Sequence, residues 1–268
     1  MTERARGHAP DAASGAGPLA ELVKDVDLLC LDAGNTIIFF DHARLSSLAA
    51  REGFVATAEA FERAEGEAKH TQERGGGVRV PWSHAGKPGA DSWAEMIATM
   101  LVCAGMARDR VPRILDVLWT EHRALNLWSR VPPGLVDSLV ALRASGARVA
   151  VVSNSEGKLE GFFERLGLMP AVDAVVDSGV VGVEKPDPRI FQIALERFGV
   201  PAASALHLGD NFVTDVGGAR AAGLRVALID PFGHLAGRHA DVPRVSGVAQ
   251  VADAIVRARR ELELNRGP

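Results

Sequence analysis

From residue 131 onward, amphipathic helix patterns alternate with short apolar runs that are typical of buried strands. The expected strands lie at about residues 149–152, 174–176, 205–208 and 225–229, and a further apolar run lies at about 26–31. Strands that alternate with helices form βαβ units and pair in parallel. The sequence therefore predicts an α/β fold: a three-layer, doubly wound, Rossmann-like parallel sheet with helices on both faces.

Residues 41–130 show a different sequence pattern, because helix patterns follow one another there without strands between them. We expect this block to form an all-helical cap domain, inserted into a core made of residues 19–40 and 131–268. A Gly- and Pro-rich loop at 73–91 interrupts the cap, and loops of that length are usually functional or disordered. Residues 1–18 are rich in Ala, Gly and polar residues, so we expect a disordered N-terminal tail.

Charge and composition argue against several classes of protein. The formal net charge is −4, so the chain lacks the basic balance that is typical of nucleic-acid binding. We see neither the apolar core of a signal peptide nor a run of membrane-spanning length, and both cysteines lie in apolar surroundings. We therefore expect a cytoplasmic monomer or homodimer that contacts neither nucleic acid nor a membrane.

Polar residues follow several of the predicted strands, where ligands collect in open α/β sheets. In chain order they are Asp32, Ser153, Asn154 and Asp210, and two further charged residues, Lys185 and Asp215, lie next to helix starts. Each has an ordinary structural role when taken alone, such as a helix cap for Ser153. Together they favour phosphoryl transfer, because a carboxylate can be a nucleophile, carboxylates bind Mg²⁺, and a lysine with a hydroxyl can hold phosphoryl oxygens.

Four motifs resemble, in order and spacing, those of the haloacid dehalogenase-like hydrolase superfamily. They are LDAGNT around Asp32, VAVVSNS around Ser153, VEKPDPRIF around Lys185, and LGDNFVTDVGGARAAG around Asp210 and Asp215. The resemblance covers about residues 26–264, and the helical block lies where this family carries a mobile cap. It implies a Mg²⁺-dependent phosphohydrolase that acts on a small phosphorylated metabolite.

The resemblance also implies a role for each motif residue. Asp32 would be the nucleophile that forms an aspartyl-phosphate, while Ser153 and Lys185 would hold the phosphoryl group. The implied ligands of Mg²⁺ are Asp32, Asp210, Asp215 and the backbone carbonyl of Gly34. The implied substrate-binding residues are Asn154, Gly34 and Asn35. We expect the cap, and above all its loop at 73–91, to contribute to substrate selection.

The chain departs from the family at Gly34. Phosphatases of the family usually carry a second Asp at this position, which protonates the leaving group and later activates water. A glycine can do neither, and general acid–base help is typically worth about 10²–10⁴-fold. Either a cap residue replaces the acid, with Asp41, His42, His70 and His84 as candidates, or the leaving group is activated, as in an acyl phosphate.

Three other readings remain as alternatives. Haloacid dehalogenases of the family usually have a tyrosine at the position of Gly34 and lose the metal aspartate, whereas this chain has no tyrosine and keeps Asp210. Phosphonate hydrolases lack the second Asp and use a cap lysine as a Schiff base, for which Lys69 and Lys87 are candidates. A catalytically weakened member would bind a phosphorylated ligand or a partner protein, although the retained Asp32 argues against it.

Overall fold

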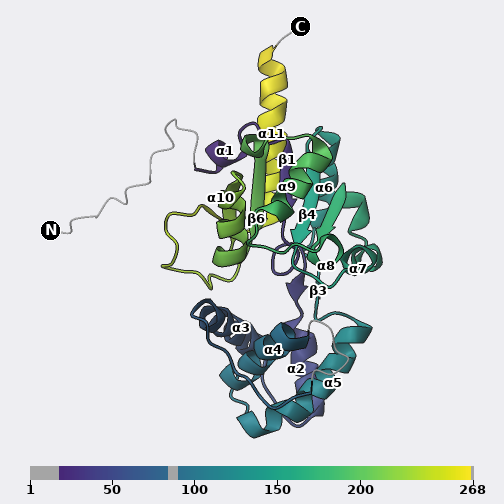
Figure 1. Cartoon of the computed structure of the whole chain (residues 1–268), viewed down its shortest axis with the longest axis vertical. Helices are drawn as coiled ribbons and strands as arrows, with labels where there is room; N and C mark the ends of the chain where they lie inside the picture. The colour runs from purple at the N-terminus through teal and green to yellow at the C-terminus, as the bar shows by residue number, and fades with distance from the viewer. Residues whose placement is uncertain (1–17, 84–89, 267–268) are drawn as a thin grey trace, which may run out of the picture.

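The computed structural model describes residues 18–83 and 90–266, and its centre is a sheet of six parallel strands (Figure 1). The strand order is β5-β4-β1-β6-β7-β8. The strands are β1 Leu28–Leu31, β4 Arg148–Ser153, β5 Ala174–Asp177, β6 Ala205–Gly209, β7 Arg225–Ile229 and β8 Arg244–Val245. The predicted Rossmann-like parallel sheet is therefore confirmed, and the short strand β8 extends it beyond the prediction.

Side chains of the strands point alternately into two buried layers, as the pleat of a strand requires. In β1, Leu29 and Leu31 join the layer that also holds the helices α1, α6, α7 and α11, while Leu28 and Cys30 join the layer of α9 and α10. The helix bounds are α1 Pro18–Val23, α6 Leu135–Ala144, α7 Leu159–Leu166, α9 Arg189–Phe198, α10 Gly218–Ala221 and α11 Val248–Arg266. Because helices cover both faces, most strand residues are apolar on both sides of the sheet, and polar residues do not alternate with them.

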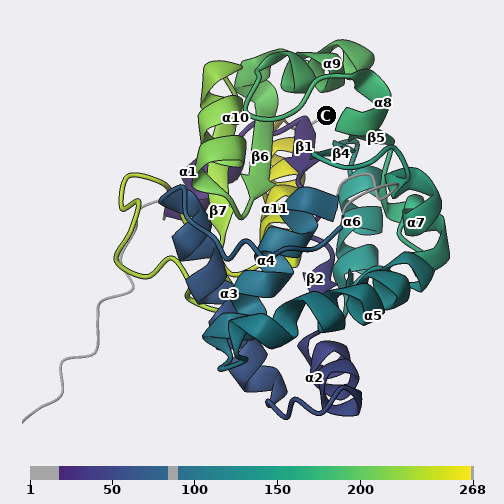
Figure 2. The ribbon, with the colours of Figure 1, turned by 60° about the horizontal axis from the view of Figure 1, so that its bottom comes forward.

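Between β1 and α6 the described residues form a block of helices that we call the cap (Figure 2). The cap helices are α2 His42–Arg51, α3 Ala58–Glu73, α4 Ala90–Cys103 and α5 Val111–Ala124. They enclose a hydrophobic cluster of their own, distinct from the two layers of the sheet. An antiparallel pair, β2 (Phe39–Phe40) and β3 (Trp128–Arg130), links the cap to the core at both ends.

The four tryptophans of the chain lie in the cap and in β3. The rings of Trp82, Trp93 and Trp119 contact one another with centroids between 5.0 and 6.1 Å apart. Trp128 of β3 packs edge-to-face on Phe40 with centroids 4.7 Å apart. Because Trp82 belongs to the segment expected as a long loop, part of that loop is packed into the cap cluster. Residues 84–89 of this loop, and the expected N-terminal tail up to residue 17, lie outside the described residues.

The largest local difference from prediction follows β6. A single helix is expected at about residues 214–222, but the chain forms a π-helical turn, Phe212–Gly217, followed by the short helix α10. Asn211 starts this turn, because its side-chain oxygen accepts hydrogen bonds from the backbone N–H groups of Val213 and Thr214 at 2.9 and 3.0 Å. Shorter helical segments elsewhere are Arg108–Arg110, Met169–Ala171, Ser178–Val181 (α8) and Ala202–Ser204. The described helices include none that is long and apolar enough to cross a membrane.

Candidate active site

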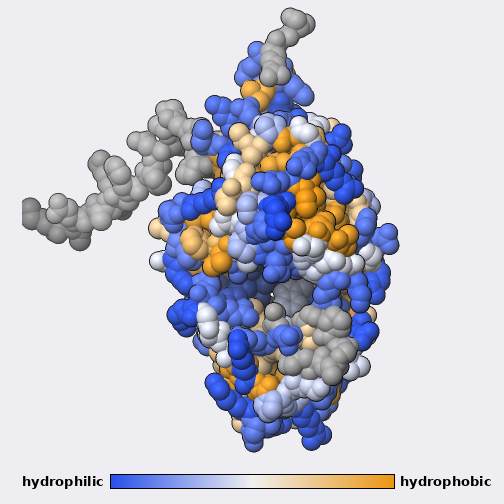
Figure 3. Space-filling view, in the orientation of Figure 1, coloured by the Kyte–Doolittle hydropathy of each residue, from blue (hydrophilic) through white to orange (hydrophobic). Residues whose placement is uncertain are grey.

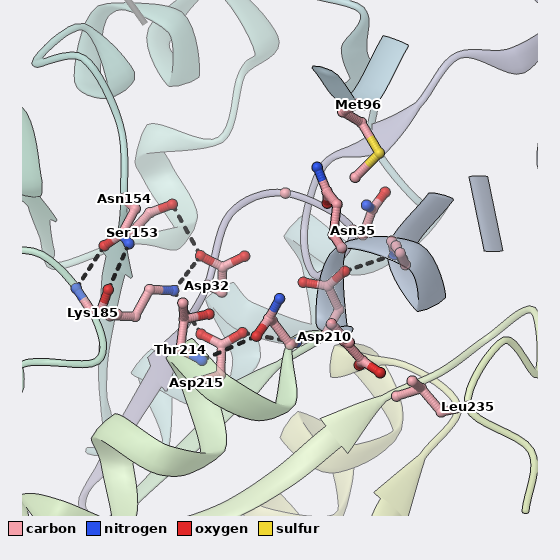
Figure 4. A pocket seen from close by; sticks show the side chains of 15 residues that line it. Asp32, Asn35, Met96, Ser153, Asn154, Lys185, Asp210, Thr214, Asp215 and Leu235 are labelled. Atoms are coloured by element: carbon pink, nitrogen blue, oxygen red, sulfur yellow. Dashed lines mark hydrogen bonds and ion pairs between the residues drawn. The ribbon is translucent and has the colours of Figure 1, made fainter. Parts of the chain in front are cut away.

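The predicted polar residues meet at the carboxyl edge of the sheet, on the side that faces the cap. Asp32, Ser153 and Asp210 arrive from the adjacent strands β1, β4 and β6. They line a cavity of about 260 Å³ between core and cap, where the molecular surface is hollowed (Figures 3 and 4). The core lines it with Asp32, Gly34, Asn35, Ser153, Asn154, Lys185, Asp210, Asn211, Thr214, Asp215 and Leu235, and the cap with Lys69, Gln72, Glu73 and Met96. The structure thus brings the eight predicted residues of the four motifs, Asp32, Gly34, Asn35, Ser153, Asn154, Lys185, Asp210 and Asp215, to one cavity.

Asp32 is buried and held by two side-chain donors. The hydroxyl of Ser153 donates to its Oδ1 atom at 3.0 Å, and the ammonium of Lys185 donates to the same atom at 2.6 Å. The backbone N–H of Asp32 donates to the carbonyl of Leu208 at 2.9 Å, which ties it to β6. The second carboxylate oxygen points away from both donors (Figure 4). This geometry presents one oxygen of Asp32 to a ligand while the other is fixed.

Lys185 bridges two carboxylates and has its backbone clamped by an amide. Its Nζ atom lies 2.6 Å from Oδ1 of Asp32 and 2.6 Å from Oδ1 of Asp215. Asn154 donates from Nδ2 to the carbonyl of Lys185 at 2.9 Å and accepts from its N–H at 2.7 Å. Asn154 therefore positions Lys185, and its contact with a substrate stays a prediction.

Asp215 is fixed by more contacts than the sequence pattern indicates. Nε2 of His207, a fully buried residue of β6, lies 3.0 Å from its Oδ1, and the backbone N–H of Asn211 donates to its Oδ2 at 3.0 Å. A Cβ at Gly209 would lie 2.2 Å from the carboxyl carbon of Asp215, so only glycine fits there. Sequence analysis missed His207, although a histidine inside an otherwise apolar strand was the available signal.

Three carboxylates of the cavity form a candidate cation site. Oxygens of Asp32, Asp210 and Asp215 lie within 4.8 Å of one another. Opposite ligands of a Mg²⁺ ion are about 4.2 Å apart, twice the Mg–O distance, so small side-chain rotations would complete the site. An all-oxygen donor set suits a hard divalent cation, and Gly34, whose carbonyl is the fourth predicted ligand, lines the same cavity. The donor set fits Mg²⁺.

The charges of the site are unevenly neutralised. Burial raises the pKa of Asp32, against the opposing charge of Lys185, and Asp215 and Asp210 add to the increase. Burial likewise raises the pKa of Asp210, although Lys69 opposes it. Burial acts on Asp215 too, but Lys185 and His207 outweigh it and hold its pKa below the ordinary range. The surroundings thus favour the anionic form of Asp215 and disfavour the anionic forms of Asp32 and Asp210, which a divalent cation would stabilise.

A cap lysine reaches the core side of the cavity. Nζ of Lys69, on α3, lies 2.7 Å from Oδ2 of Asp210 and 3.7 Å from Oε1 of Glu65. Burial lowers the pKa of Lys69, but the two carboxylates outweigh it and raise the pKa above its ordinary value. Sequence analysis names Lys69 only as a Schiff-base candidate, and its partner Asp210 lies 141 positions away.

Gly34 has space for a side chain, and the next residue, Asn35, has an unusual backbone conformation. A Cβ at Gly34 would lie 3.8 Å from Cδ1 of Trp128, which is an ordinary contact. Asn35 has a positive φ of 53°, and its backbone N–H donates to the carbonyl of Ile38 at 2.7 Å. Its side-chain Oδ1 is buried and has no hydrogen-bond partner among the described residues.

The described cap candidates for the missing acid do not line the cavity. Asp41 caps α2 by accepting from the N–H of Arg44 at 2.9 Å. His42 pairs with the buried Glu65 at 2.8 Å, and His70 contacts the backbone oxygen of His234. Two other named residues, His84 and Lys87, lie outside the described residues. The ionisable groups that α3 does bring to the cavity are Lys69 and Glu73.

Comparison with known proteins places the chain in a family. Residues 26–223 match the model of the haloacid dehalogenase-like hydrolases. The chain is 36% identical over 138 residues to the human haloacid dehalogenase-like hydrolase domain-containing protein 3, a match that covers 51% of this chain and 55% of that protein. It is 32% identical over 160 residues to the phosphoserine phosphatase of Thermus thermophilus, covering 56% and 62%. The chain spans about half the length of the curated relatives it matches.

Solved structures agree on the fold. The HAD-hydrolase YfnB of Bacillus subtilis, in a crystal form bound to magnesium, aligns with a TM-score of 0.58 and 16% identity. The alignment covers 86% of this chain and 98% of that one, and therefore includes both core and cap elements. At this identity the likeness shows the fold alone.

Proposed function

The chain belongs to the haloacid dehalogenase-like hydrolases, and on that premise we propose that it is a Mg²⁺-dependent phosphohydrolase that acts on a small phosphorylated metabolite through an aspartyl-phosphate on Asp32. One observation carries the proposal: a buried carboxylate, Asp32, is held through a single oxygen by Ser153 and Lys185. A phosphatase among the relatives, the phosphoserine phosphatase of Thermus thermophilus, supports a phosphate ester as the substrate.

The mechanism assigns a task to each residue. A carboxylate oxygen of Asp32 attacks phosphorus, the bond from phosphorus to the leaving oxygen breaks, and the leaving group departs as an oxyanion that takes a proton from water or stays ionised when it is a good leaving group. The Ser153 hydroxyl and the Lys185 ammonium hold the phosphoryl oxygens and neutralise their charge. Water then attacks phosphorus, releases inorganic phosphate and restores the carboxylate. Asn154 and Asp215 keep Lys185 in place through the contacts described above.

A bound Mg²⁺ would be held by Asp32, Asp210, Asp215 and the carbonyl of Gly34, and it would supply positive charge at the phosphoryl oxygens. Because Gly34 offers no acid, turnover of unactivated esters depends on water or on a cap group of the cavity. Substrates with good leaving groups, such as acyl phosphates, need no acid.

Phosphonate cleavage is disfavoured by the state of Lys69. A Schiff base forms from a neutral amine, whereas Asp210 and Glu65 stabilise the charged ammonium of Lys69. Haloacid hydrolysis is disfavoured by the retained Asp210 and by the absence of tyrosine from the chain.

The proposal is tested by phosphate release from sugar phosphates, nucleotides, acyl phosphates and phosphonates, with Mg²⁺ or EDTA. We expect Mg²⁺-dependent release that the Asp32→Asn variant lowers by about 10³-fold or more, because the nucleophile is lost. A folded, Mg²⁺-loaded protein without Asp32-dependent turnover of any compound would overturn the proposal. Ligand-induced stabilisation without turnover would instead support a protein that binds a phosphorylated ligand.

A further inference from the structure

Lys69 is a charged group that the proposed mechanism does not use. It lies on α3, lines the same cavity as Asp32, and its side chain is 16% exposed. Its close partner is Asp210 at 2.7 Å, and its second partner, Glu65 at 3.7 Å, already pairs with His42 at 2.8 Å. The positive charge of Lys69 is therefore compensated mainly by Asp210.

Asp210 is also a predicted ligand of Mg²⁺. A divalent cation at Asp210 would take over much of the negative charge of this carboxylate and would repel the ammonium of Lys69. A buried ammonium that loses its carboxylate carries a desolvation penalty unless another anion replaces it. Lys69 lines the cavity that would receive the substrate, so an anionic group of the substrate could take the place of Asp210 beside it.

The position of Lys69 indicates which part of the substrate it meets. In an in-line displacement the leaving group departs on the side opposite the nucleophile. Ser153 and Lys185 hold Asp32 from the core, so the leaving group extends toward the cap face, which carries Lys69, Gln72 and Glu73. The carboxylate of Glu73 is already paired with Arg238 and lies 3.9 Å from His239. Among the described cap residues that line the cavity, Lys69 is therefore the charged group that remains for a ligand.

We propose that Lys69 is a specificity-determining residue that binds an anionic group, a carboxylate or a second phosphate, on the leaving group of the substrate. This inference rests on the proposed function, since it concerns the same cavity. The substrate class is then a phosphate ester of an acid, with its second anion a few bonds from the ester oxygen. When this substrate binds, Lys69 exchanges Asp210 for the substrate anion and draws α3 onto the closed site.

The test uses two probes that differ in one group. 3-Phosphoglycerate and glycerol 3-phosphate have the same phosphate ester and chain length, but only the first carries a carboxylate. We expect the wild-type protein to prefer 3-phosphoglycerate in kcat/KM by about tenfold or more, the effect of one charge-assisted hydrogen bond. Lys69→Met should abolish the preference through a higher KM for the acid, and Lys69→Arg should retain part of it. Arg63→Met, which removes an exposed charge from the same helix, should leave it unchanged.

Binding gives a second readout that needs no turnover. In the Asp32→Asn background, we expect 3-phosphoglycerate with Mg²⁺ to raise the melting temperature more than glycerol 3-phosphate does, and Lys69→Met to remove the difference. Equal wild-type affinity for both probes, or equal losses on both in Lys69→Met, would overturn the assignment of Lys69. Absence of Asp32-dependent phosphate release from every compound of the panel, acetyl phosphate included, would overturn the proposed function instead, so the two failures are distinguishable.

Discussion

Among the described residues, the core contributes Lys185 to the cavity and the cap contributes Lys69, and the two lysines are held differently. Lys185 of the core lies 2.6 Å from each of two carboxylates, and Asn154 clamps its backbone on both sides. Lys69 of the cap has one close carboxylate at 2.7 Å and a second at 3.7 Å. The core lysine pairs with residues of the core, whereas the cap lysine has its main ion-pair partner, Asp210, in the core.

The core and the cap also differ in how the backbone that carries each lysine is held in place. Strand ends and their adjoining loops position the core residues. Besides the Lys69–Asp210 pair, the cap helix α3 makes polar contacts with a core segment that follows β7: His70 contacts the carbonyl of His234, and Glu73 pairs with Arg238. His234 also lies against Gly66, where a Cβ would come within 2.6 Å of its ring. The core half is thus suited to hold the reacting groups in one geometry, and the cap half is suited to contacts that can be exchanged for contacts with a substrate.

Removal of the core lysine tests the difference between the two lysines with the largest expected effect. We expect Lys185→Met to lower kcat by about 10³-fold, because the phosphoryl group loses a charged donor and two buried carboxylates lose their cation. Lys69→Met should instead change substrate preference. Phosphate-release kinetics on both variants measure the difference, and Lys158→Met, at an exposed core position, serves as the control. Equal losses of kcat in both lysine variants would refute the asymmetry.

A second prediction concerns the stability of the cap. Burial raises the pKa of Glu65, but Lys69 and His42 outweigh it and lower the pKa from 4.5 to about 2. The folded pKa lies below the unfolded one, so the stabilisation is complete above about pH 4.5 and is lost as the pH falls toward 2. Its size is on the order of 3 kcal/mol. Melting temperatures between pH 6 and 3 should fall less steeply in Glu65→Gln than in the wild type; parallel curves would contradict this.

The smallest expected effect comes from adding a general acid to the core at position 34. A Cβ at Gly34 meets only ordinary contacts with Trp128, so Gly34→Asp should fold. We expect it to raise kcat on unactivated esters by about 10–100-fold, part of the usual worth of an acid, and to leave acyl phosphates unaffected. Gly34→Asn, which has the same size without the acid, is the control. An equal gain in the Asn variant would show that the side chain acts by packing alone.

The core side of the site follows from the sequence because its signals are local. Apolar runs locate the strands, and a polar residue after each run locates the edge where Asp32, Ser153 and Asp210 meet. Because parallel strands end at the same edge of the sheet, the relative positions of these residues are then largely determined. The details after β6 were beyond this reasoning, because the π-helical turn depends on the cap formed by Asn211.

The cap side does not follow, because helix periodicity shows which residues share a face but not what that face meets. Glu65, Lys69 and Glu73 recur at a spacing of four on α3, yet their contacts with Asp210 and Arg238 depend on how two separate hydrophobic clusters dock. The same limit explains His42, which pairs with Glu65 instead of reaching the cavity. Long-range ion pairs leave no periodic trace in the sequence.

The distribution of aromatic residues gives the two halves different optical properties. The chain has four tryptophans and no tyrosine, and Trp82, Trp93, Trp119 and Trp128 all belong to the cap or to the strand that joins it to the core. Intrinsic tryptophan fluorescence therefore reports the cap and its junction with the core, because the strands of the parallel sheet contain no tryptophan. Trp128 lies beside Gly34, and Gly34 lines the cavity, so one tryptophan is a close neighbour of the cavity wall at the junction of the two halves.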